Sequence, residues 1–173
     1  MASPLTLVRQ RATEDWLIGD SSQKLARLAT ERFAELGIWQ TPPRILLAER
    51  EPCSFLAGLI AACSVPSSLF LANPDWGEIE RQQVLALVQP DLIWGEGEQK
   101  AEGRGMESES LVSLPFTIHY PPSTIHIPTG GSSGEIKFVT HTWKTLMASV
   151  EGFRRYFGVD RVNSCCLLPL YHV

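Results

Sequence analysis

The sequence has few cysteines, and none of them is placed for a metal or redox site. There are four cysteines in 173 residues, without a CxxC pair or a cysteine and histidine cluster at zinc-ligand spacing. Two of them, Cys53 and Cys63, lie in one apolar stretch. The other two, Cys165 and Cys166, are neighbours in a second apolar run. We predict buried, reduced thiols, with a vicinal disulfide across the adjacent pair as the alternative.

The chain also lacks an excess of positive charge and a long hydrophobic segment. Its 15 lysines and arginines stand against 19 aspartates and glutamates, which gives a formal net charge of -4. No overall field therefore attracts it to nucleic acid or to an anionic membrane, and a bound anion must be held by local groups. The longest apolar run, residues 55–63, is about half of the roughly 20 residues of a membrane-spanning helix, and no signal-peptide pattern opens the sequence. We expect a cytoplasmic protein without a membrane span.

The hydrophobic content and its periodicity predict an α/β fold. Hydrophobic residues make up 44% of the chain, which is enough for the core of a domain of this length. A first amphipathic helix is predicted from Ser21 or Ser22 to Gly37, because serine caps helix starts and glycine caps helix ends. Strands and helices then alternate, with strands at 44–49, 68–73 and 91–94 and helices at 54–65 and 78–89. Such alternation with short connections indicates right-handed βαβ units and a parallel sheet covered by helices.

The rest of the chain interrupts this alternation. Residues 95–110 are rich in Gly, Glu and Ser, so we predict a solvated, mobile acidic loop there. Further strands are predicted at 111–120, 124–127, 135–140 and 163–168, and a long helix at 142–157. Along this helix, apolar side chains recur at helical spacing from Trp143 to Phe157. That stripe predicts a helix buried against the core.

One segment carries residues that suit anion binding. It consists of Thr129, Gly130, Gly131, Ser132, Ser133 and Gly134, with Lys137 three residues further on. The glycines permit positive φ angles and close approach, so successive backbone N–H groups can face one oxyanion. The hydroxyls add donors and the lysine adds charge. The segment is neither a Walker A loop nor a GxGxxG turn, and a plain hairpin turn is the alternative that composition alone supports.

Residues 129–138, TGGSSGEIKF, resemble the phosphate-binding loop of the acyl-adenylate-forming enzymes. This family contains acyl-CoA ligases, luciferases and the adenylation domains of peptide synthetases, and its usual pattern is Ser/Thr-Ser-Gly-Ser/Thr-Thr-Gly-x-Pro-Lys-Gly. Three positions depart from it: Gly130 replaces a hydroxyl residue, Ile136 replaces Pro and Phe138 replaces Gly. The resemblance implies that the hydroxyls, the glycine amides and Lys137 hold the β- and γ-phosphates of ATP.

A second motif follows in the order that this family has. Residues 168–173, LPLYHV, are similar to the Pro-Leu-Phe-His segment beside the acyl and adenylate pocket, which makes His172 the candidate catalytic residue that lines the acyl pocket. Upstream, Asn73-Pro74 and Gln89-Pro90-Asp91 match the family's strand, helix and strand before the loop. With His141-Thr142-Trp143, these motifs most resemble the 2-succinylbenzoate-CoA ligases of menaquinone and phylloquinone synthesis.

The resemblance implies a two-step reaction on a small carboxylic acid that uses ATP, Mg²⁺ and CoA. The acid forms an acyl-adenylate, and the thiol of CoA then displaces AMP. It also implies that residues 1–173 form the layered sheet and helices of the family's N-terminal AMP-binding domain, truncated before the small C-terminal lid domain. We therefore expect a chain that is inactive alone, and a homo-oligomer stays open. The alternatives are a fatty-acid or aryl-acid CoA ligase of the same family, or a non-catalytic α/β module whose Gly/Ser loop only binds an anion.

Overall fold

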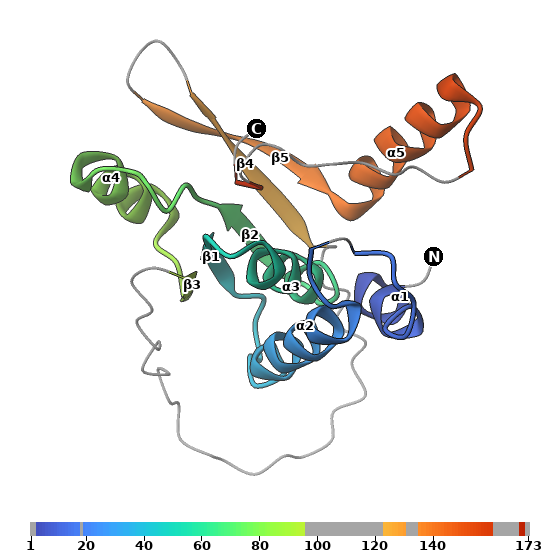
Figure 1. The fold of residues 1–173 in the computed structure, drawn as a ribbon. Helices are drawn as coiled ribbons and strands as arrows, with labels where there is room; N and C mark the ends of the chain where they lie inside the picture. The colour runs from blue at the N-terminus through green and yellow to red at the C-terminus, as the bar shows by residue number, and fades with distance from the viewer. Residues whose placement is uncertain (1–2, 18, 96–122, 131–134, 161–169, 172–173) are drawn as a thin grey trace, which may run out of the picture.

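The computed structural model describes residues 3–17, 19–95, 123–130, 135–160 and 170–171 (Figure 1). The predicted acidic loop after residue 95, the strands at 111–120 and 163–168, and the second pair of cysteines lie outside these residues. All further structural statements refer to the described ranges.

The predicted helices and strands are present within the described residues, with ends that shift by up to three positions. The structure also has a helix for which no bounds were predicted, α1 (Pro4–Gln10). The predicted elements follow it as α2 (Ser22–Leu36), β1 (Arg44–Ala48), α3 (Pro52–Ala62), β2 (Ser68–Leu71), α4 (Glu78–Val88), β3 (Leu92–Gly95), β4 (Thr124–Gly130), β5 (Ile136–Thr142) and α5 (Trp143–Phe157). The predicted caps are confirmed for the first long helix. The side chain of Ser21 accepts a hydrogen bond from the Lys24 amide, and Gly37 is the C-cap residue.

The five strands form one sheet in the order β3-β1-β2-β4-β5. β3, β1, β2 and β4 are mutually parallel, as predicted, while β5 runs antiparallel to β4. The antiparallel pair follows from the short connection between β4 and β5, since a parallel neighbour needs a crossover of a dozen or more residues. The sheet is therefore mixed, with its antiparallel hairpin at one edge.

Helices cover both faces of the sheet (Figure 1). α3 connects β1 to β2 and packs with α2 and α1 on one face, where Ile45, Leu69 and Trp94 are fully buried. α4 connects β2 to β3 and lies on the other face, where Val84 and Val88 pack against Leu46. The connections that leave β1 and β2 thus run to opposite faces. In open α/β sheets, ligands bind in the crevice at the carboxyl ends of such a strand pair.

The predicted burial of the last helix is wrong. No side chain of α5 is buried, and Val150, Phe153 and Phe157 expose 48%, 49% and 58% of their surface. Only the first turns of the helix reach the core, through Trp143 and Leu146. The helix leaves β5, the edge strand, and extends away from the sheet (Figure 1), so the remaining turns have no core beneath them. In the part of the chain that the structure describes, no helix is both long and apolar enough to cross a membrane.

Candidate functional site

Two chain segments extend beyond the edge of the sheet where β1, β2 and β4 have their carboxyl ends, which we call the carboxyl edge. β4 pairs with β2 up to Phe70 and His126 and then continues to Gly130. β2 ends at Leu71, so the last three residues of β4 extend about 10 Å past it, at roughly 3.3 Å per residue. The start of the predicted phosphate loop therefore lies beyond the same edge as the turn that follows β2.

Thr129 and Lys137 face each other at the end of the β4–β5 hairpin. They are directly paired in the antiparallel register, and the Thr129 hydroxyl donates to the carbonyl oxygen of Lys137 at 3.3 Å. Both side chains are exposed. Within the described residues, no hydrogen bond or ion pair occupies the Lys137 ammonium group. The Lys137 ammonium group is thus available to an anion at this position, whereas the Thr129 hydroxyl proton is donated within the hairpin.

The two departures from the family pattern on either side of Lys137 fix the face on which it lies. Ile136 and Phe138 pack against the cluster beneath α4, and the Phe138 ring meets Phe70 edge to face with centroids 5.3 Å apart. Successive residues of a strand point to opposite faces. Lys137 is therefore directed to the face opposite α4, together with its partner Thr129.

The structure places part of the predicted site and leaves the other part outside the described residues. Thr129, Gly130 and Lys137 come together at the hairpin end, where Gly130 pairs with Ile136. The remaining candidates are not described: Gly131, Ser132, Ser133, Gly134 and His172. Their roles stay predictions.

Tyr171, the neighbour of His172, is joined to the turn that follows β2. Its hydroxyl donates to Oδ2 of Asp75 at 2.9 Å, across 96 positions of sequence. The other carboxylate oxygen of Asp75 pairs with Nη1 of Arg50, which follows β1. This hydrogen bond, more than the accompanying desolvation, raises the pKa of Tyr171 above its ordinary value. Tyr171, from the second motif of the resemblance, therefore contacts the turn that begins with the upstream Asn73-Pro74 match.

Sequence reasoning missed Arg50 and Asp75. The available signal was their position, because each charged residue stands within four residues of the carboxyl end of a strand that reads as buried. Polar side chains at the carboxyl ends of parallel strands share one edge of the sheet and can meet there. Which of the charges at that edge pair with each other depends on the register, which the sequence does not state.

His126 is held in the sheet by contacts of its ring and of both ring nitrogens. Its ring stacks on Phe70 with centroids 4.1 Å apart, and its two ring nitrogens contact the hydroxyls of Thr124 and Thr140 at 3.0 and 3.1 Å. Burial lowers the pKa of His126. A neutral imidazole with one donor and one acceptor nitrogen suits this pair of hydroxyls, so the ring is held in the sheet and is not free to act on a substrate.

A cluster of Asp20, Glu51 and Cys53 resembles a metal site only by proximity. One ligand atom from each lies within 4.8 Å of the others. The ammonium group of Lys24, however, lies 3.1 Å from the Asp20 carboxylate and 3.4 Å from that of Glu51. Glu51 also accepts from the amides of Cys53 and Ser54 as the N-cap of α3. The cluster is a helix cap neutralised by a lysine.

The two described cysteines are free and buried, as predicted. Burial raises the pKa of Cys53 to about 11 and that of Cys63 to about 12. Since the thiolate is the reactive form, neither is a candidate nucleophile.

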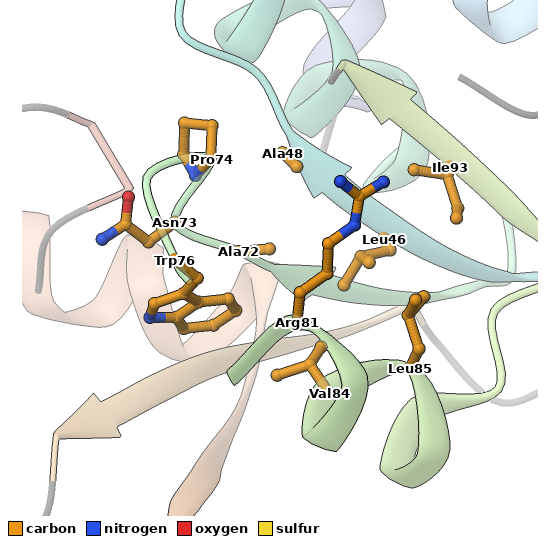
Figure 2. Close-up of a pocket in the computed structure, with 10 residues that line it drawn as sticks. All are labelled: Leu46, Ala48, Ala72, Asn73, Pro74, Trp76, Arg81, Val84, Leu85 and Ile93. Atoms are coloured by element: carbon orange, nitrogen blue, oxygen red, sulfur yellow. The ribbon is translucent and has the colours of Figure 1, made fainter. Parts of the chain in front are cut away.

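An apolar pocket lies on the α4 face of the sheet (Figure 2). It is open to solvent, and its walls include Leu46, Trp76 and Leu85. Figure 2 shows Arg81 extending from α4 across this space toward Ala48. Lys137 and Thr129 lie on the opposite face of the sheet, so the pocket is not part of the hairpin end that is predicted to bind an anion.

Comparison with known proteins gives a fold. No family model matches the sequence, and no curated protein matches it. O-succinylbenzoate coenzyme A synthetase (MenE) from Bacillus subtilis, in complex with AMP, is 13% identical with a TM-score of 0.69, and the match covers 99% of this chain and 50% of that one. The N-terminal domain of FACL13 from Mycobacterium tuberculosis is 14% identical with a TM-score of 0.65, over 99% and 52%.

A third solved structure, McyG A-PCP complexed with phenylalanyl-adenylate, is 17% identical with a TM-score of 0.55, over 89% of this chain and 30% of that one. The predicted fold class is confirmed: the mixed sheet and its helices have the α/β arrangement of the N-terminal domain of AMP-binding enzymes. The chain spans about half the length of the first two structures.

Proposed function

We propose that this chain is the N-terminal portion of an ATP-dependent acid-CoA ligase, and that its acid is 2-succinylbenzoate. The observation that carries the proposal is the pairing of Thr129 with Lys137 at the carboxyl edge of the sheet. Two further facts support it: the surrounding TGGSSGEIKF motif, and a fold shared with proteins solved in complex with AMP and with phenylalanyl-adenylate. Because the chain spans about half of two such structures, the reaction is proposed for the whole protein.

In the proposed first step, a carboxylate oxygen of the acid attacks the α-phosphorus of ATP. The bond between the α-phosphorus and the bridging oxygen breaks, and pyrophosphate leaves with the electron pair. Donors that face the β- and γ-phosphates stabilise this growing charge. The Thr129 hydroxyl, the Lys137 ammonium, the serine hydroxyls and the glycine amides of residues 130–134 would supply them. Mg²⁺ would be bound by the phosphate oxygens and would neutralise part of the same charge.

In the proposed second step, the thiol of CoA loses its proton to solvent and its sulfur bonds to the acyl carbon. The bond between that carbon and the phosphate oxygen of AMP breaks, and AMP leaves with the electron pair. The carboxyl edge is the place for this chemistry, because it gathers the hairpin end, the turn after β2 and Tyr171. His172 follows Tyr171 directly in sequence, and we assign it to the wall of the acyl pocket.

Acid-dependent exchange of labelled pyrophosphate into ATP tests this proposal on the full-length protein. The panel consists of 2-succinylbenzoate, a long-chain fatty acid and benzoate. We expect exchange with 2-succinylbenzoate at least tenfold above the other two. A preference for one of the other acids would support the ligase and overturn its assigned substrate. Absence of exchange with every acid, in a protein that is folded by circular dichroism, would overturn the ligase itself.

The isolated chain is expected to release no pyrophosphate with any of these acids. Its folded state is checked by cooperative unfolding in urea. Turnover by residues 1–173 at the rate of the full-length protein would contradict the assignment of the chain to one portion of the enzyme.

A further inference from the structure

The carboxyl edge holds a network of three side chains from distant parts of the sequence. Arg50 lies in the connection after β1, Asp75 in the turn after β2, and Tyr171 at the far end of the chain. Arg50 contacts Asp75 with Nη1 and donates from Nη2 to the carbonyl oxygen of Pro74 at 3.2 Å. Tyr171 donates to the remaining oxygen of the same carboxylate at 2.9 Å. Asp75 is therefore the common partner of both.

Asp75 is itself held in place by the turn that carries it. Its backbone amide donates to Oδ1 of Asn73 at 2.8 Å, which is the local hydrogen bond of an Asx turn. Pro74 restricts the φ angle between the two residues. The guanidinium of Arg50 contacts both the carboxylate and the turn carbonyl, and a planar fork of this kind fixes orientation as well as distance. The acceptor for Tyr171 is thus built on the ends of two neighbouring strands.

The hydroxyl of Tyr171 is not needed for packing, because the ring alone makes the contacts with the core. The ring, with Leu170, packs against the core cluster on the α3 face. A phenylalanine, which the family pattern has at this position, would pack in the same way. Only tyrosine can also donate to Asp75. The hydroxyl therefore adds a directional tie to a segment that packing already brings to the edge.

We propose that Asp75 and Arg50 are positioning residues that hold Tyr171 at the carboxyl edge between β1 and β2. The identity of what is positioned, the wall of the acid pocket, rests on the proposed function. The tie itself stands on the contacts among the three side chains. We name it the edge clamp, consisting of Arg50, Asp75 and Tyr171.

The first test measures the edge clamp without any activity. Tyrosine labelled with ¹³C at Cζ is incorporated into the chain, and each phenol is titrated by NMR, with Tyr171→Phe used to assign its signal. We expect Tyr171 to titrate above the ordinary range for tyrosine and to return to it in Asp75→Ala. Tyr156, which exposes 84% of its surface on α5, is the internal control and should not change. An unchanged Tyr171 titration in folded Asp75→Ala would overturn the clamp.

The second test separates positioning from a purely structural role in the full-length enzyme. Loss of a hydrogen bond to a charged group corresponds to about a tenfold change in an equilibrium constant. We expect Tyr171→Phe to raise KM for the acid about tenfold while KM for ATP stays unchanged. Tyr156→Phe, the same chemical change away from the edge, should alter neither constant. Equal changes in both constants, or no change, would overturn the positioning role.

The two tests fail separately. An enzyme that activates no acid overturns the proposed function and, with it, the assignment of His172. The titration decides the clamp in that case as well, because it needs only the folded chain. A Tyr171 that responds to Asp75 in an inactive protein would leave the clamp as a structural tie and remove its positioning role.

Discussion

Gly95, at the end of β3, is a position where the backbone permits no side chain. Its φ angle is +103°, and an added Cβ would lie 2.2 Å from the carbonyl oxygen and 2.5 Å from the carbonyl carbon of Ala48. Both are backbone atoms of β1, and Gly95 is paired with Ala48 in the sheet. No rotation of a side chain can relieve this contact, so Gly95→Ala must separate the ends of β1 and β3.

The loss of stability on Gly95→Ala has two parts, one from the positive φ angle and one from the contact with Ala48. A left-handed backbone costs a residue with a Cβ about 1–2 kcal/mol, and overpacking costs about 1–3 kcal/mol more. We expect Gly95→Ala to lower the free energy of unfolding by about 3 kcal/mol. With a urea m-value of about 2 kcal/mol per molar for a chain of this size, the midpoint should fall by about 1.5 M.

Urea unfolding followed by circular dichroism measures this shift on the chain itself. Gly152→Ala is the matched control, because no atom lies within 4 Å of a Cβ added there, in the middle of α5. Alanine should stabilise that helix by about 0.5–1 kcal/mol, so the two variants should move in opposite directions. A Gly95→Ala variant that unfolds at the urea concentration of the wild type would refute the β1–β3 geometry.

Three further predictions concern a helix cap, the thiols and the exposed helix. Glu51→Ala should lower stability by about 1 kcal/mol, because it removes the N-cap of α3. Partial burial opposes the charged form of Glu51, but the amides of Ser54 and Cys53 lower its pKa in the folded chain. The stability that Glu51 adds should therefore be complete above its unfolded pKa and be lost as the pH falls through its folded pKa. In urea melts, the difference in unfolding free energy between wild type and Glu51→Ala should shrink at acid pH. Cys53 and Cys63 should resist iodoacetamide at pH 8 in the native chain and react in urea, as read by peptide mass spectrometry; rapid native labelling would contradict their burial. Phe153→Gln should shift the urea midpoint by less than about 0.5 M, which corresponds to about 1 kcal/mol of stability, and it should reduce binding of an apolar dye. A midpoint shift as large as that expected for Gly95→Ala would contradict the exposure of α5.

Local rules predicted most of the helices and strands in the described residues. Ser21 begins the long helix because its side chain accepts a hydrogen bond from the Lys24 amide. Gly37 is the C-cap residue at the predicted position, with a φ of -65° that does not itself require glycine. The apolar runs of β1 and β2 are short and bounded by charge or proline, which is typical of strands buried on both faces. These signals lie within a few residues of each other, so they can be read without knowledge of the fold.

Features that depend on distant residues could not be predicted in this way. The periodicity from Trp143 to Phe157 indicates that one face of α5 is apolar, and the structure shows that the half of this face formed by Val150, Phe153 and Phe157 is exposed. Whether such a face is buried depends on what the sheet places beneath it. The contact between Asp75 and Tyr171 spans 96 positions, and it exists because β2 and the end of the chain reach the same edge.

The candidate site was partly predictable for a similar reason. The order of residues from Thr129 to Lys137 supports the hypothesis of anion binding, and that order is read directly from the sequence. It does not state that Ile136 and Phe138 anchor the strand against the α4 side and so direct Lys137 to the other face. That orientation follows from the alternation of side chains once the register of the hairpin is known.

The proposed contact of Lys137 with the phosphates of ATP can be tested by removing its charge. Exchange of pyrophosphate into ATP, driven by 2-succinylbenzoate, is compared in the full-length wild type, Lys137→Ala and Lys144→Ala. Lys144 is an exposed lysine on α5, so its variant removes the same charge away from the hairpin end. Removing a donor that stabilises developing charge costs about 100-fold or more in rate. We expect Lys137→Ala to lose about 100-fold or more of the exchange rate and Lys144→Ala to keep the wild-type rate. Exchange by Lys137→Ala at the wild-type rate would contradict the role of Lys137 in phosphate binding.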